Sequence, residues 1–114
     1  MKIIKSFMDA ANGIAKSISS ERNLKIQVTL MICVIVLGLM VRLSRFEWII
    51  CIVLFGLVIS AEMFNTALEE TLNYINDDYC DKIGFIKDAS AGAVLIIAIA
   101  SAAIGAIIFI PKLI

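Results

Sequence analysis

Three long apolar stretches, separated by short charged blocks, constrain the fold of this chain more than any other feature. They cover residues 26–41, 46–68 and 89–110. With 61% hydrophobic residues and a mean hydropathy of +1.01, a chain of 114 residues has more apolar surface than a soluble core of this size would bury. At 1.5 Å per residue, the first stretch spans about 24 Å and the third about 33 Å, close to the thickness of a bilayer's hydrocarbon core. The sequence therefore predicts an all-α membrane protein, one domain over 1–114 with three transmembrane helices.

The N-terminal segment has a different pattern. Over residues 2–19, apolar side chains recur at three- and four-residue steps, while lysines and other polar residues fill the opposite side. The apolar run is short and interrupted by charges, so we expect an amphipathic helix that lies on the membrane surface, with its lysines near anionic headgroups. The hydrophilic stretch 69–88, which contains several Asn and Asp residues and Gly84, is predicted to be a loop.

A polar stripe occupies the end of the second apolar stretch. Glu62, Asn65 and Glu69 follow at i, i+3 and i+7, so they share one helix face. A carboxylate within a membrane span costs roughly 2.5 to 3.5 kcal/mol on insertion scales and usually serves function or pairing. The stripe is therefore a candidate site, although Glu62 as a simple marker of the helix end is the alternative.

Positive charge sets the expected orientation. Seven Lys and Arg residues lie in the N-terminal segment and the 69–88 stretch, against three on the other side of the spans. By the positive-inside rule, the amino terminus and the stripe face the cytoplasm, where ATP and magnesium are available.

The composition narrows the chemistry of such a site. The chain has no histidine, so carboxylates, lysines, tyrosines or water must carry any proton transfer near neutral pH. Its net charge is zero and no basic run tracks a phosphate backbone, so nucleic acid is not an expected partner.

The charged residues near the stripe favour phosphate chemistry. Magnesium is usually held by one or two carboxylates plus substrate phosphates, so Glu21 and Glu69 would suffice if they converge. Glu62, deeper in the apolar layer, suits a general base for a lipid hydroxyl, and Lys87 could face a phosphate. No glycine-rich P-loop is present. Three of these residues also have simpler interpretations. Glu21 could be a solvated acid at the membrane interface, Lys87 a snorkelling anchor, and Asp88 an acid that favours the start of a helix.

Two motifs make the chain recognisable. Residues 61–69 read AEMFNTALE, and eighteen residues after Glu69 the chain continues as KDASAGAV over 87–94. This pair resembles the bacterial integral-membrane diacylglycerol kinase family, over nearly the whole chain. Within that family the chain is most similar to the undecaprenol kinases of Gram-positive bacteria, through residues 6–7 (SF), 21–24 (ERNL), 47–48 (EW) and 109–113 (FIPKL).

The resemblance implies a homotrimer in the bacterial cytoplasmic membrane, with active sites at subunit contacts. It implies transfer of the ATP γ-phosphate to the hydroxyl of a membrane lipid, with Mg²⁺ as cofactor. Glu62 would be the general base, and Glu21 and Glu69 would bind magnesium and nucleotide. The residues that would help to hold the nucleotide or order the site are Asn65, Asp78, Tyr79, Lys87 and Asp88. Asn73 departs from the family, which usually has an acid at this position.

Other functions stay open at this stage. Diacylglycerol is the alternative acceptor to undecaprenol. A small proton-coupled transporter could also use Glu62 as its carrier site, but that function predicts a carboxylate near mid-membrane. A non-catalytic assembly subunit would explain the small residues of the third span and leave the polar stripe without a purpose.

Overall fold

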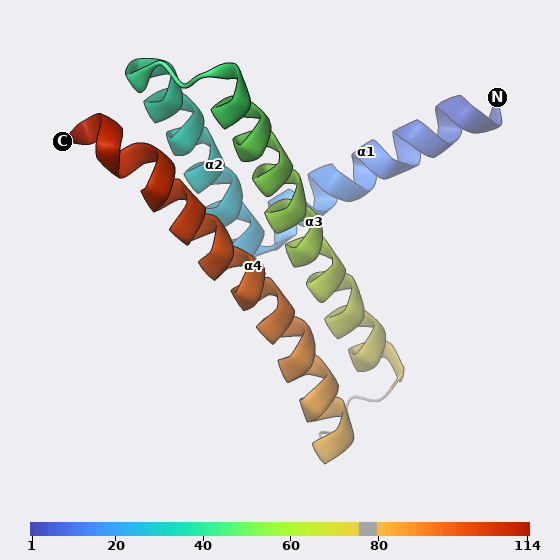
Figure 1. Ribbon diagram of the computed structural model, residues 1–114. Helices are drawn as coiled ribbons and strands as arrows, with labels where there is room; N and C mark the ends of the chain where they lie inside the picture. Colours follow the sequence, from blue (N-terminus) through green and yellow to red (C-terminus); the bar gives the residue numbers. More distant parts are fainter. Residues whose placement is uncertain (76–79) are drawn as a thin grey trace.

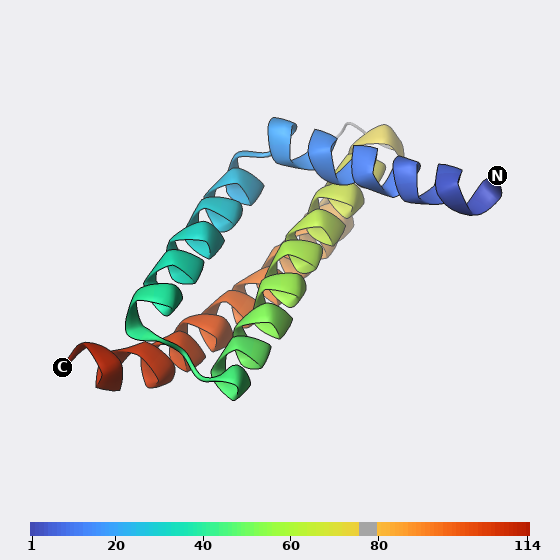
Figure 2. The ribbon, with the colours of Figure 1, turned by 90° about the horizontal axis from the view of Figure 1, so that it is seen from above.

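Four helices make up the protein. The computed structural model describes residues 1–75 and 80–114, which form α1 (Lys2–Ser20), α2 (Arg22–Val41), α3 (Arg45–Ile75) and α4 (Asp81–Leu113). α2, α3 and α4 run alongside one another, with α3 antiparallel to both neighbours, and α1 projects away from them at a steep angle (Figures 1 and 2). The described ranges contain no strand, in agreement with the predicted all-α class.

The three predicted apolar stretches lie within α2, α3 and α4. Each of these helices is long and apolar enough to cross a membrane. Apart from the polar residues towards the end of α3 and the start of α4, they are apolar on every side, which is the pattern of a helix surrounded by lipid or by other helices and not of a helix on a soluble core.

The prediction of a loop over 69–88 is wrong for most of its length. α3 continues to Ile75 and α4 already begins at Asp81. Residues 69–75 are mostly polar but include no glycine or proline, and Leu72 keeps a half-buried position on α3. The loop was predicted from the polarity of this stretch. Helical hydrogen bonding and the packing of α3 against α4 instead extend both helices into it.

The helices differ in length. α3 has 31 residues and α4 has 33, whereas α2 has 20. In Figure 1, α3 and α4 therefore extend together beyond the level at which α2 begins. We call this extension the projecting end of the α3–α4 pair.

A tight turn joins α2 to α3 at the opposite end. Arg42 adopts a left-handed conformation with φ 59°, and the Leu43 N–H donates to the Gly38 carbonyl, which closes α2. Ser44 and Glu47 then cap α3 reciprocally, because each backbone N–H donates to the other's side chain. Glu47 also forms an ion pair with Lys112 of α4 at 3.1 Å, so this end of the α3–α4 pair is tied.

The buried core is small and lies near this turn. It consists of Leu43, Cys51, Ile108 and Phe109, with Leu24 buried separately near the start of α2. Many large apolar side chains on all four helices are exposed, among them Leu39, Phe64, Ile96 and Ile107. The single chain thus leaves most of its apolar surface for other contacts.

α1 contributes no buried residue. Its apolar side chains Ile3, Ile4, Phe7 and Met8 are all exposed. α1 ends where Glu21 takes an extended conformation, and α2 starts immediately after it. Glu21 therefore lies at the junction between α1 and α2.

Candidate active site

Two polar side chains are buried in the described helices, and both belong to the predicted stripe. Glu62 is 4% exposed and Asn65 is 9% exposed, although both lie on the long apolar helix α3. Burying a carboxylate and an amide costs free energy unless partners satisfy them. The partners of these two groups therefore define the site.

Among the described residues, only one of the two polar atoms of the Asn65 side chain has a hydrogen-bond partner. Its Nδ2 donates to Glu69 Oε1 at 3.2 Å, one turn further along α3. Its Oδ1 is buried and has no hydrogen-bond partner among the described residues. An unpaired buried acceptor of this kind is suited to a donor or a cation supplied by a ligand.

Glu62 faces the start of α2. Asn23 lies against its carboxyl group, and Glu21 and Glu69 are the charged groups near enough to act on it. Glu21 is the N-terminal cap residue of α2, yet its side chain makes no capping hydrogen bond. Glu21, at the start of α2, and Glu69, two turns along α3, therefore lie on the same side of the bundle as Glu62, and their convergence on a metal ion stays a prediction.

Lys87 of α4 contacts a different residue of α3, Asn73. Its Nζ donates to Asn73 Oδ1 at 2.6 Å, across the projecting end of the α3–α4 pair. Asp88 follows on α4 and is exposed. Asp78 and Tyr79, predicted to contact the nucleotide, lie outside the described residues.

Two residues that contact the candidate site residues were not among the predicted ones. Asn23 stands beside Glu62, although the sequence shows it only as part of the ERNL segment. Asn73 is the partner of Lys87. It continues the stripe at i+4 from Glu69, so helical periodicity alone could have identified it.

A magnesium ion fits this donor set only together with phosphates. The described residues contain no group of three acids or other ligands placed to hold a metal ion on their own. Mg²⁺ is commonly bound by one or two carboxylates plus substrate phosphates and water. Glu21 and Glu69 would provide that number, and the Asn65 side chain, whose Nδ2 donates to Glu69, has an unpaired oxygen that could accept from a ligand.

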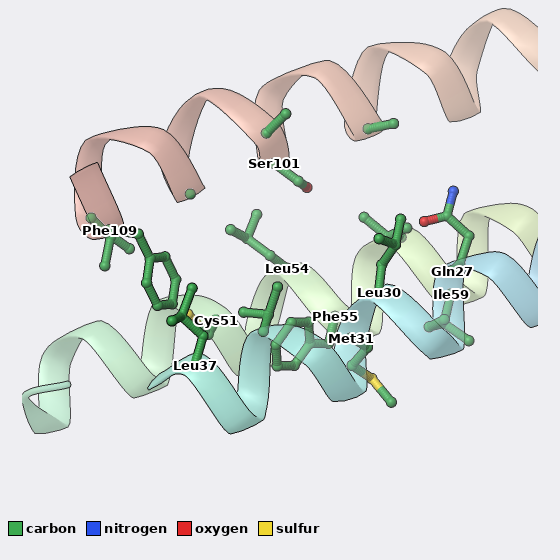
Figure 3. A pocket seen from close by; sticks show the side chains of 16 residues that line it. Gln27, Leu30, Met31, Leu37, Cys51, Leu54, Phe55, Ile59, Ser101 and Phe109 are labelled. Atoms are coloured by element: carbon green, nitrogen blue, oxygen red, sulfur yellow. The ribbon is translucent and has the colours of Figure 1, made fainter. Parts of the chain in front are cut away.

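An apolar cavity of about 470 Å³ lies between α2, α3 and α4. Figure 3 shows side chains of all three helices around it, including Leu30, Leu54, Ile59 and Phe109. Gln27 and Ser101 are its polar lining residues. Ile59 lies three residues before Glu62, so the cavity reaches to within about one helical turn of the buried carboxylate.

Comparison with known proteins decides the family. The sequence profile of the prokaryotic diacylglycerol kinases matches residues 8–109, which include Glu21, the stripe and Lys87–Asp88. The chain belongs to the prokaryotic diacylglycerol kinase family.

Two relatives place the chain within this kinase family. An undecaprenol kinase of Bacillus subtilis (strain 168) is 39% identical over 112 residues, which cover 98% of this chain and 91% of that protein. A diacylglycerol kinase of Synechocystis sp. is 29% identical over 97% of this chain and 64% of its own length. Both relatives are lipid kinases, so the resemblance inferred from the two motifs is confirmed, and the transporter and assembly-subunit alternatives lose their support.

Proposed function

We propose that this protein is an ATP-dependent kinase of the bacterial cytoplasmic membrane that phosphorylates undecaprenol to undecaprenyl phosphate. The observation that carries the proposal is the buried Glu62 carboxylate, one turn beyond the end of an apolar cavity. A lipid alcohol needs both features, an apolar space for its chain and a base at its hydroxyl. The 39% identity to an undecaprenol kinase over nearly the whole chain supports the choice of acceptor.

Glu62 is proposed as the general base. The acceptor oxygen attacks the γ-phosphorus, the bond to the β,γ-bridging oxygen breaks, and ADP leaves while the hydroxyl proton passes to the Glu62 carboxylate. Asn23, which lies against that carboxyl group, would hold it in position. Positioning and charge neutralisation supply most of the acceleration in phosphoryl transfer, so the base need contribute only part of it.

Glu21 and Glu69 are proposed to bind Mg²⁺ together with the triphosphate. The ion would neutralise the charge that develops on the transferred group. Asn65, Lys87 and Asp88 would help to bind the triphosphate, as would Asp78 and Tyr79 outside the described residues. The unpaired Asn65 oxygen supports this part of the proposal, because a bound ligand would give it a partner.

The orientation follows from charge, and the placement of α1 from its composition. The excess of Lys and Arg on the N-terminal side of the spans supports a cytoplasmic amino terminus and site. The exposed Ile4, Phe7 and Met8 of α1, opposite its lysines, support a helix that lies in the membrane interface. Cysteine labelling from either side of the membrane, at a position introduced in α1, tests both; labelling only from outside would contradict this orientation.

A homotrimer is proposed as the working form. The chain buries few apolar residues of its own, and the family resemblance implies three subunits with sites at their contacts. Light scattering of the detergent-solubilised protein should give three times the chain mass of 12.5 kDa. A monomer that is fully active would contradict this part of the proposal.

Diacylglycerol is the second candidate acceptor, supported by the Synechocystis relative at 29% identity. A competition assay separates the two. With magnesium and ATP, purified protein in mixed micelles should phosphorylate undecaprenol in preference to an equal amount of diacylglycerol. Preference for diacylglycerol would reverse the assignment of the acceptor, and phosphorylation of neither lipid in any membrane mimic would refute the kinase function.

A further inference from the structure

The polar stripe of α3 is one residue longer than the three residues that define it. Asn73 lies eleven residues after Glu62, which is close to three turns, and four residues after Glu69. It therefore shares their helix face. The stripe passes from a buried carboxylate at Glu62 to an exposed amide at Asn73, at the projecting end of the α3–α4 pair.

Lys87 meets the stripe at this amide and not at a carboxylate. The Nζ–Oδ1 distance of 2.6 Å is short, as expected for a hydrogen bond with an ionised donor. Among the described residues, the carboxylates form no ion pair with Lys87. The ammonium group is thus oriented by a neutral partner.

A neutral partner has a specific electrostatic consequence. The Asn73 oxygen takes one of the three N–H donors of Lys87 and leaves two for a ligand. It fixes the direction of the side chain, which otherwise has many rotamers, without cancelling its positive charge. An aspartate at the same place, which is the kind of residue that the family usually has there, would pair with the ammonium and reduce its attraction for an anion, so the neutral partner is a feature of this chain.

We propose that Asn73 is a positioning residue that holds the Lys87 ammonium, with its charge uncompensated, for the polyphosphate of the nucleotide. The inference rests on the proposed function, since it takes a nucleotide as the anion that Lys87 meets. It assigns to Asn73 a role in nucleotide affinity, exerted through Lys87 and not by contact with the reacting atoms.

Four variants test the proposal in a double-mutant cycle with a charge arm. Purified N73A, K87M, N73A/K87M and N73D are assayed for the KM of magnesium-ATP and for kcat at saturating undecaprenol. Binding of a non-hydrolysable ATP analogue is measured separately. T71A is the matched control, because the Thr71 hydroxyl donates only to a carbonyl of its own helix and is exposed.

N73A should raise the KM for ATP and the Kd of the analogue by about fivefold with kcat nearly unchanged, because a hydrogen bond to a charged group is lost at an exposed site. K87M should raise both further, and adding N73A to K87M should change nothing more. N73D should also raise the KM, whereas T71A should match the wild type.

The inference is overturned if N73A binds ATP normally, or if N73A weakens binding as much in the K87M background as in the wild type. A N73D enzyme with a KM at or below the wild-type value would overturn it as well, since charge on Lys87 would then not be what the amide preserves. These results differ from a failure of the proposed function, in which the wild type itself neither binds the analogue nor phosphorylates a lipid.

Discussion

At the scale of single residues, the polar side chains of the stripe become progressively more exposed along α3. Glu62 and Asn65 are buried, Glu69 is half-buried, and Asn73 is exposed. Glu62 and Glu69 are seven residues apart, which corresponds to about 10.5 Å along α3. The proposed base and the proposed metal ligand can therefore be tested separately.

Glu62→Gln keeps the shape of the side chain and removes the base. We expect kcat to fall by about 10²- to 10⁴-fold, the usual contribution of general base catalysis, while binding of an ATP analogue persists. Steady-state kinetics combined with the binding assay measures both. Ser60→Ala, an exposed position two residues earlier, serves as the control. Near-normal turnover of the Gln variant would remove Glu62 from the role of base.

Glu69→Gln removes one proposed carboxylate ligand of Mg²⁺ and retains an oxygen that can still accept from Asn65 Nδ2. The KM for magnesium-ATP should rise by about tenfold or more, because an interaction with a charged partner is lost. The magnesium concentration needed for half-maximal activity should rise with it, and a titration of Mg²⁺ at fixed ATP measures this shift. An unchanged magnesium dependence would argue against Glu69 as a ligand.

At the scale of elements, the turn between α2 and α3 depends on a close approach at Gly38. A Cβ at this position would lie 2.8 Å from Leu43 Cδ1 and 2.8 Å from Trp48 Cη2. Leu43 is buried and belongs to the small core, so it has little room to move.

Gly38→Ala should therefore destabilise the protein by about 1 to 3 kcal/mol, the usual cost of overpacking. Thermal unfolding in detergent, followed by circular dichroism, measures the loss as a lower Tm. Gly13→Ala is the control, because nothing lies within 4 Å of its added Cβ and alanine favours a helix by about 1 kcal/mol. Equal Tm values for the two variants would show that the turn relaxes around the new methyl group.

Helical elements were predictable from the sequence, whereas their ends were not. The apolar runs locate α2, α3 and α4, because a long apolar stretch has few alternatives to a helix in a bilayer. Polarity was a poor guide to where α3 ends, since residues 69–75 are mostly polar and still helical. Likewise, the Ser44–Glu47 capping pair and the Glu47–Lys112 ion pair depend on the path of the turn, which spacing alone does not specify.

The site was predictable to a similar degree. Periodicity put Glu62, Asn65 and Glu69 on one face of α3, and the structure has two of them buried. The partner of Lys87 was not predicted, because it depends on the register between α3 and α4 at their projecting end. The same holds for Asn23 beside Glu62, which depends on how the start of α2 meets α3.

At the scale of the whole molecule, the apolar cavity would give the proposed lipid acceptor a place in the fold. It is lined by three helices, so its occupant would touch most of the membrane domain (Figure 3). Ala102 lines it, whereas the neighbouring Ala103 on α4 does not, and both are exposed in the single chain. This pair of alanines offers a matched comparison of equal added volume.

Ala102→Leu should narrow the cavity and raise the KM for undecaprenol several-fold, with the KM for ATP unchanged. Ala103→Leu adds the same side chain outside the cavity and should leave both constants near wild type. Kinetics with varied lipid at saturating ATP, and the reverse, separate the two substrates. Should the two variants behave alike, the acceptor chain does not occupy this cavity.

Because α3 is longer than α2, it carries polar residues at several levels along its axis. α2 begins near the level of Glu62, while α3 and α4 extend beyond it as a pair that carries Glu69, Asn73 and Lys87 further out. A water-soluble triphosphate and a hydroxyl anchored among lipid tails normally occupy different layers, and the enzyme must bring them to one level. If the proposed roles hold, the spacing of polar residues along α3 would set that level, and the number of helical turns between them would determine where the two substrates meet.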